Sequence, residues 1–275
     1  MKNDELRYGD DVLGGASEVE RRRLVAIAET NDPTTRALLR SLGLTAGWTC
    51  WEVGAGAGTV ATWLADQVVA DGGSVLATDI DDAALAMASA APQPGLSVQR
   101  HDVVHDPLPD TRFHLIHARF VLEHLRERED VLDRLVSALA PNGIIVIESV
   151  AHGFIESSPH APLREAMSGL EQVMAATIGT DCSWARNFPA CFLARGLTDL
   201  GAQARISSTG GRNASATCWA LTLQRLRPRI LEQGLSSAEA LDAADQLLSD
   251  PMFFDFVFSS IAGWGRRKGL REKTG

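Results

Sequence analysis

Two periods of apolar positions alternate along the middle of the chain, and they predict which segments are strands and which are helices. Short apolar runs are typical of strands, whereas apolar positions three or four residues apart indicate helices that face a core. The expected strands are 48–53, 74–79, 96–100, 113–117 and 143–149, and the expected helices lie near 59–70, 82–90, 120–123 and 129–139. Residues 144–147 (Ile-Ile-Val-Ile) are apolar toward both faces, as buried parallel strands are. The repeated strand–helix units predict an α/β fold with a doubly wound, mostly parallel sheet.

The segment before the first strand predicts a helical cover formed by residues 1–47. One helix is expected at 17–30 and a second at about 33–42. Pro33 would occupy the first turn of the second helix, where proline is tolerated, and Gly43 would end that helix.

After residue 150 the pattern changes, and two helical insertions are expected within a domain that spans 48–275. These cap insertions would cover about 151–200 and 213–250, with helices at 162–178, 189–200, 215–233 and 237–249. Two further strands, 202–208 and the aromatic run 253–264, would complete a seven-stranded sheet. A competing interpretation pairs 203–208 with 217–223 as a hairpin.

Composition and charge narrow the class of protein. The 275 residues are 45% hydrophobic and carry a formal net charge of −9, and a nucleic-acid partner needs a basic surface, so none is expected. Neither a signal peptide nor a membrane-spanning run is evident, so we expect a cytoplasmic protein with no membrane partner. The four cysteines lack metal-site spacing, which favours reduced thiols and no metal: Cys50, Cys182, Cys191 and Cys218.

A glycine-rich turn follows the first expected strand, within Trp51–Val60. Gly54, Gly56 and Gly58 let the backbone curl tightly and approach a ligand, and the next helix points its free N–H groups into the turn. In open α/β sheets this carboxyl end of the first strand is a ligand site. A dinucleotide fingerprint needs a third glycine where Thr59 stands, so the register disfavours a nicotinamide oxidoreductase.

Acidic residues end the next two strands. Asp79, followed by Ile80, ends the second strand, where a carboxylate can accept two hydrogen bonds from a ribose diol. Asp102 follows the third strand, where a carboxylate can accept from the exocyclic amine of an adenine. The backbone N–H of the next residue, Val103, could then meet a ring nitrogen.

In this order, over about residues 48–150, these motifs resemble the class I S-adenosylmethionine-dependent methyltransferases. The stretch from Tyr8 to Leu24 and the ending Ala262–Arg267 are similar to a bacterial small-molecule branch that includes many natural-product enzymes. The resemblance implies a Rossmann-like fold and S-adenosylmethionine as cofactor, with S-adenosylhomocysteine as product. The residues that it assigns to cofactor binding are Tyr8, Glu52, Gly54, Gly56, Gly58, Asp79, Ile80, Asp102, Val103 and Ala118.

The resemblance also implies a role for each part of this set. The three glycines would line the methionine and ribose, Asp79 would hold the ribose hydroxyls, and Ala118 would lie under the sulfonium end. Two departures from common patterns stand in the fourth strand. His114 occupies a position often held by Asp, and His117–Phe120 replaces the D/N-P-P-Y/F motif of enzymes that methylate adenine or cytosine amines.

We therefore expect methyl transfer to an oxygen, nitrogen or carbon atom of a small, fairly apolar metabolite. Such a transfer is a direct displacement in which alignment and exclusion of water dominate. The alternative is a methyltransferase-fold protein repurposed as a ligand-binding module or a non-methylating catalyst. A homodimer is compatible with either function.

A general base helps only if the acceptor is a hydroxyl or a protonated amine, and histidine suits that role. His152, after the fifth strand, is the candidate catalytic base, and His124 is a second candidate ahead of His160 and His117. Residues that could line an apolar acceptor pocket are Met167, Met174, Trp184, Phe188, Phe192, Trp219 and Met252.

Overall fold

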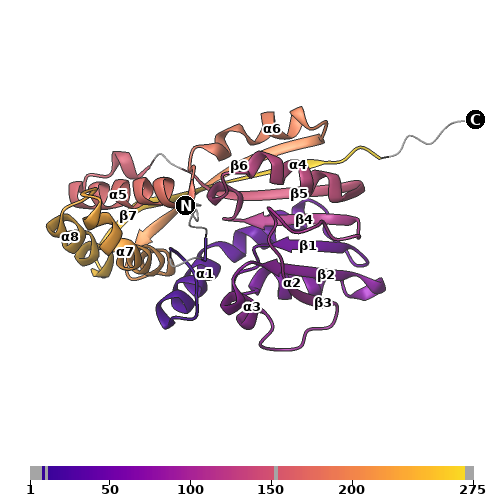
Figure 1. Ribbon diagram of the computed structural model, residues 1–275, viewed down its shortest axis with the longest axis horizontal. Coiled ribbons are helices and arrows are strands. Elements are labelled where there is room, and N and C mark those ends of the chain that lie inside the picture. Colours follow the sequence, from indigo (N-terminus) through magenta and orange to yellow (C-terminus); the bar gives the residue numbers. More distant parts are fainter. Residues whose placement is uncertain (1–7, 10–11, 152–153, 270–275) are drawn as a thin grey trace, which may run out of the picture.

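The computed structural model describes residues 8–9, 12–151 and 154–269, which fold around one seven-stranded sheet (Figure 1). The strands lie in the order β3-β2-β1-β4-β5-β7-β6, and β7 runs antiparallel to the other six. Their bounds are β1 Thr49–Val53, β2 Ser74–Asp79, β3 Leu96–Arg100, β4 Phe113–Arg119, β5 Leu139–Ala151, β6 Thr198–Gly210 and β7 Phe254–Arg266. The predicted α/β fold with a seven-stranded, mostly parallel sheet is confirmed.

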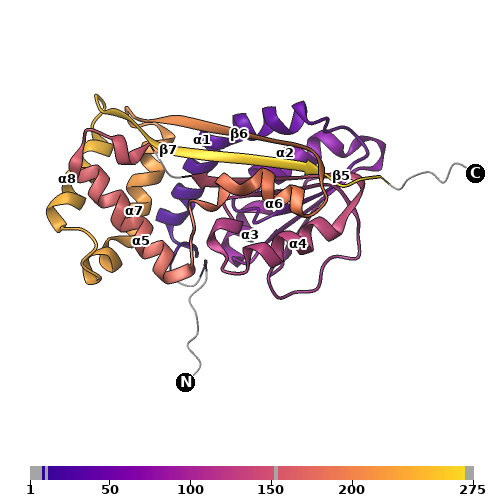
Figure 2. The same ribbon diagram turned by 90° about the horizontal axis from the view of Figure 1, so that it is seen from above.

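Helices cover both faces of this sheet and one of its ends. Figure 2 shows α1 and α2 on one face and α4 and α6 on the other, while α5, α7 and α8 lie together beyond one end (Figure 1). The helices are α1 Glu18–Ser41, α2 Thr59–Val68, α3 Asp82–Ala88, α4 Arg128–Ala138, α5 Ala161–Ile178, α6 Phe188–Ala194, α7 Ala214–Glu232 and α8 Ala238–Ser249. Short 3₁₀ turns are η1 Ala70–Gly72, η2 Leu122–His124, η3 Ile155–Ser157 and η4 Trp184–Asn187. In the described part of the chain, no helix combines the length and apolar character needed to cross a bilayer.

A single long helix, α1, replaces the two helices expected before the first strand. Pro33 lies in its interior rather than at a first turn. An internal proline removes one backbone hydrogen bond and crowds the preceding turn, so the helix needs support from elsewhere. The neighbouring Asp32 and Thr35 supply it, because both side chains bond to residues of the sheet. The predicted break at Pro33 is therefore wrong.

The second half of the chain differs from prediction in two places. The expected helix 189–200 ends already at Ala194, because Gly196 takes a left-handed φ of +71° and β6 begins at Thr198. The competing hairpin is also wrong, since 217–223 lies inside α7 and β6 pairs with β7.

A buried row of charges crosses the three central strands. Glu52 of β1, His117 of β4 and Glu148 of β5 are at most 6% exposed. The two ring nitrogens of His117 bond to Glu52 Oε2 at 2.7 Å and to Glu148 Oε1 at 3.0 Å. Burial alone would lower the pKa of His117, but the charges and hydrogen bonds of the two carboxylates outweigh it and raise the pKa to about 9. His117 is therefore an imidazolium at neutral pH.

The same row of charges anchors α1. Thr35 donates from Oγ1 to Glu148 Oε1 at 2.7 Å, and Arg119 donates to Thr35 Oγ1 at 2.9 Å. A second Arg119 nitrogen donates to Asp32 Oδ1 at 2.8 Å. Each bond joins α1 to β4 or β5, so the charges that would be costly to bury alone are paired and hydrogen-bonded.

We expect the stability of the protein to fall as the pH rises from 6.5 toward 9. The folded state holds the His117 proton more tightly than the unfolded chain, so this contribution is complete below the unfolded pKa of 6.5 and is lost as the pH rises through about 9. The loss should be on the order of 2–3 kcal/mol, from the size of the pKa shift. Urea unfolding across this pH range measures it.

His117→Gln is the control for this measurement, because the variant lacks the titrating group. Its free energy of unfolding should change less over the same pH range than that of the wild type. Parallel curves for the two proteins would contradict the assignment of His117 as a buried cation.

Candidate active site

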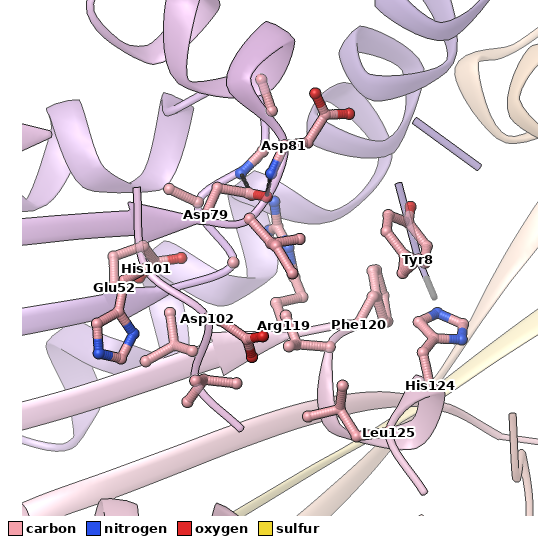
Figure 3. A pocket seen from close by; sticks show the side chains of 18 of the residues that line it. Tyr8, Glu52, Asp79, Asp81, His101, Asp102, Arg119, Phe120, His124 and Leu125 are labelled. Atoms are coloured by element: carbon pink, nitrogen blue, oxygen red, sulfur yellow. Dashed lines mark hydrogen bonds between the residues drawn. The ribbon is translucent and has the colours of Figure 1, made fainter. Parts of the chain in front are cut away.

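A cavity of about 180 Å³ opens at the carboxyl ends of the first four strands (Figure 3). We call it the sheet-end cavity. Eight of the ten residues proposed from the sequence for cofactor binding line it: Tyr8, Glu52, Gly54, Gly56, Asp79, Ile80, Asp102 and Val103. The side of this cavity away from the strands is formed by α1, through Glu20, Leu24, Ile27 and Ala28.

The glycine turn between β1 and α2 forms one wall of the sheet-end cavity. Gly54 and Gly56 both have positive φ, and a Cβ on Gly54 would lie only 2.2 Å from Val121 Cγ2. A side chain at Gly54 is therefore excluded by packing as well as by backbone conformation. Gly58 has a different role, since its Cβ would lie 2.6 Å from Ala88 and it does not line the cavity. It allows α2 and α3 to pack closely.

Asp79 is held in place by the backbone around it. Its Oδ2 accepts from the Gly56 N–H at 2.8 Å, and its Oδ1 accepts from the Asp81 N–H at 3.0 Å. Burial raises the pKa of Asp79, and these N–H groups oppose that rise. The backbone N–H of Ile80 also bonds to this carboxylate, and a carboxylate offers about four lone-pair positions, so Asp79 retains acceptor capacity for a ligand in the cavity.

Asp102 and Val103 lie across the sheet-end cavity from the glycine turn. The Asp102 carboxylate accepts from the Val104 N–H at 2.9 Å and lies 3.1 Å from His105 Nδ1, so part of its capacity is used within its own loop. Val103 is 7% exposed and packs in the core beneath the cavity. Ala118 is fully buried in β4 and does not line the cavity.

A second cavity, of about 140 Å³, lies between α1 and the helices α5 and α7. We call it the cap cavity. Its apolar lining includes Met167, Met174 and Trp219, three of the residues suggested for an acceptor pocket. The other residues suggested for that pocket lie elsewhere: Trp184, Phe188 and Phe192 belong to the core beneath α4 and α6, and Met252 is 84% exposed on the surface.

The two cavities share one wall, formed by Tyr8, Ile27, Phe120 and His124. The rings of Tyr8 and His124 stack with centroids 5.1 Å apart, and Figure 3 shows them facing each other beside Phe120. Arg23 donates a hydrogen bond to the Tyr8 hydroxyl at 2.7 Å, and this bond holds the Tyr8 ring in position. We call these four residues the shared wall.

The histidines proposed as bases have different surroundings. His124 belongs to the shared wall, and its Nδ1 lies 2.9 Å from Thr180 Oγ1. Burial, followed by the charges of Arg23 and Arg128, lowers the pKa of His124 to about 3, so the ring is neutral. Both ring nitrogens of His117 are hydrogen-bonded to carboxylates, so the ring has no free lone pair with which to accept a proton. His160 packs against Phe253 and lines neither cavity. His152 lies outside the described residues.

Sequence reasoning gave no role to several residues that line the cavities. Arg119 ends β4 and Phe120 directly follows it, and this place at the carboxyl edge of the sheet is visible in the sequence. The left-handed φ of +59° at Phe120, in contrast, leaves no trace in the sequence. Glu20 and Arg23 form a buried ion pair at 2.6 Å on α1, and their spacing of three residues is visible in the sequence. In the described part of the chain, metal-ligating side chains form no cluster of three.

The fold and the sheet-end cavity agree with the resemblance noted in the sequence. A sheet of order 3-2-1-4-5-7-6 carries a glycine turn after β1 and an acidic residue at the end of β2, and both line a cavity at the carboxyl ends of the strands, where open α/β sheets bind ligands. A family model described as a methyltransferase domain matches residues 51–145, the part of the chain that carries the glycine turn and Asp79.

Similar proteins agree with this resemblance. The methyltransferase GfsG of Streptomyces halstedii is 28% identical over 126 residues, which are 45% of this chain and 45% of that relative. The match therefore spans less than half the length of GfsG. The structure of YcgJ from Bacillus subtilis has a TM-score of 0.61 and 16% identity, over 87% of this chain and 100% of that one. A phosphoethanolamine N-methyltransferase 2 of Haemonchus contortus, in complex with S-adenosylhomocysteine, has a TM-score of 0.58 and 14% identity. The match covers 96% of this chain and 61% of that one.

The packing of Gly54 gives a prediction about the glycine turn. Gly54→Ala should lower the free energy of unfolding by about 2–4 kcal/mol, because it combines a left-handed alanine with a clash against Val121. Gly56→Ala carries the backbone cost alone, since its nearest neighbour is Leu24 Cδ2 at 3.8 Å. Urea unfolding of both variants measures the difference.

A double variant separates the clash from the backbone cost. Gly54→Ala/Val121→Ala should lose less free energy of unfolding than the sum of the losses in the two single variants. The alanine at position 121 is shorter than valine and makes room for the methyl group at position 54. Equal costs for Gly54→Ala and Gly56→Ala, with no such coupling, would contradict the packing argument.

Proposed function

We propose that the protein transfers the methyl group of S-adenosylmethionine to an oxygen, nitrogen or carbon atom of a small, largely apolar molecule. The observation that supports this proposal is the shared wall between two cavities of different character. The sheet-end cavity carries the residues that suit a polar nucleoside, and the cap cavity is lined largely by apolar side chains such as Met167 and Trp219.

The residues that line the sheet-end cavity suit the methyl donor. The turn presents backbone without side chains at Gly54 and Gly56, and the Asp79 carboxylate beside it would accept from the ribose hydroxyls. Asp102 and Val103 would flank the adenine. Gly58 and Ala118, which do not line the cavity, would act through packing.

Glu52 would attract the amino group of the methionine. One of its carboxylate oxygens is bonded to His117, and the side chain also lines the sheet-end cavity. The hydrogen bond to His117 holds the Glu52 carboxylate in place. Tyr8 would close the cavity on the side of α1.

When bound, S-adenosylmethionine supplies an activated methyl group, so the protein has mainly to align the acceptor and exclude water. Ile27 and Phe120 of the shared wall are apolar and would keep water from the transfer path. Tyr8 and His124, stacked and hydrogen-bonded on their far sides, would hold the acceptor atom in one position.

Isothermal titration with S-adenosylmethionine tests the donor site. Asp79→Asn should weaken binding by about 10- to 100-fold, since it replaces charge-assisted hydrogen bonds to the ribose with weaker ones. Asp82→Asn is the matched control, because this nearby carboxylate is 83% exposed. Absence of binding to the wild type would refute the proposal.

Transfer itself is tested with deuterium-labelled methyl donor and a panel of candidate metabolites. We expect one labelled methyl group to appear on an acceptor, detected by mass spectrometry, and S-adenosylhomocysteine to form in equal amount. Conversion of a compound without gain of label would instead identify a non-methylating catalyst that has kept the fold.

A further inference from the structure

A buried ion pair lies across the boundary between the two cavities. Glu20 lines the sheet-end cavity, whereas Arg23 lines the cap cavity, and their side chains are bonded at 2.6 and 2.9 Å. Both residues are at most 4% exposed. The negative end of the pair therefore faces the donor side and the positive end faces the acceptor side.

The Tyr8 hydroxyl adds a hydrogen-bond donor at the same boundary. It accepts from Arg23 Nη2 at 2.7 Å, which leaves its own proton available. Burial, opposed by Arg23, raises the pKa of Tyr8, so the group stays protonated. Within the described residues the structure shows no acceptor for this proton, and Tyr8 lines both cavities.

A strong base is absent from the described part of the shared wall. His124 is neutral, and a proton added to it would create a further positive charge beside Arg23 and Arg128. Glu123, next to it, uses its two carboxylate oxygens on Ser149 and on the Val150 N–H. The titratable and charged groups that face this region include Glu20, Arg23, Asp79, Glu123, Arg128, Glu171, Cys182 and Cys218.

We propose that the cap cavity selects an acceptor whose methylated group binds as an oxygen anion, a carboxylate or an ionised phenol or enol, held by the Tyr8 hydroxyl and Arg23. This inference rests on the proposed methyl transfer and names the class of its substrate. The acceptor gives up its proton to solvent before or upon binding. A lone pair on oxygen, or the π pair at the enolate carbon as the C=O bond re-forms, then makes the bond to the methyl carbon, while the carbon–sulfur electrons stay on sulfur.

The polarity of the ion pair suits such a reaction. Glu20 faces a cationic donor and Arg23 an anionic acceptor, so each ion is stabilised on its own side. The two charges cancel during transfer, and the transition state is less charged than the bound reactants. Tyr8 and Arg23 should therefore act on acceptor binding more than on the rate of the chemical step.

The test measures binding of matched probes to the protein saturated with S-adenosylhomocysteine. Naphthalene and decane frames are compared, each as carboxylate, primary alcohol and primary amine, by titration calorimetry and ligand-observed NMR at neutral pH. We expect the carboxylate of at least one frame to bind about tenfold or more tightly than its alcohol and its amine.

Two variants locate the preference. Tyr8→Phe removes one hydroxyl and should reduce the preference for carboxylate severalfold. Glu20→Gln/Arg23→Gln removes the ion pair without leaving a single buried charge and should abolish the preference. Arg22→Gln is the control, because this exposed arginine on the same helix carries the same charge, and it should leave the preference unchanged.

Each outcome decides one question. Equal or tighter binding of the alcohol or amine, no binding of any carboxylate, or an unchanged preference in Tyr8→Phe would overturn the inference. Binding of S-adenosylhomocysteine, measured in the same titrations, is independent of these results. Its absence would refute the proposed function, whereas its presence without a carboxylate preference would refute only the anionic acceptor.

Discussion

The imidazolium of His117, bonded on both sides to buried carboxylates, is the interaction on which the rest of the structure depends. It fixes Glu52 at the edge of the sheet-end cavity and Glu148 beneath α1. Through Thr35, Glu148 helps to keep α1 continuous past Pro33. Removing any one partner would leave an uncompensated buried charge, so the row of charges specifies how α1 lies on the sheet.

Most of the sheet could be predicted from the sequence because its information is local. The run 144–147 is apolar toward both faces, and the glycine turn and Asp79 each stand at the end of a strand. Since parallel strands end at the same edge, residues distant in sequence come together there without any knowledge of packing. Gly58 shows the limit of this reasoning, because only the contact with Ala88 reveals that it serves helix packing.

The features that could not be predicted depend on contacts between distant segments. The sequence around Pro33 is typical of a helix start, and the support from Glu148 and Arg119 that overrides this preference comes from strands about one hundred residues away. The acceptor pocket was predicted from aromatic and sulfur-containing side chains alone. Phe188 and Phe192 are aromatic like Trp219, but they lie in the core beneath α4 and α6 and do not line the cap cavity.

Helix α1 contributes to both cavities, and this has a consequence for how such a protein can diversify. Leu24 and Ala28 line the sheet-end cavity, while Thr30 and Asn31 line the cap cavity. Because all four residues belong to the same helix, α1 fixes the distance between the two cavities. The remaining walls of the cap cavity come largely from α5 and α7. Substitutions there can reshape the cap cavity during evolution while the sheet-end cavity and its alignment are inherited unchanged.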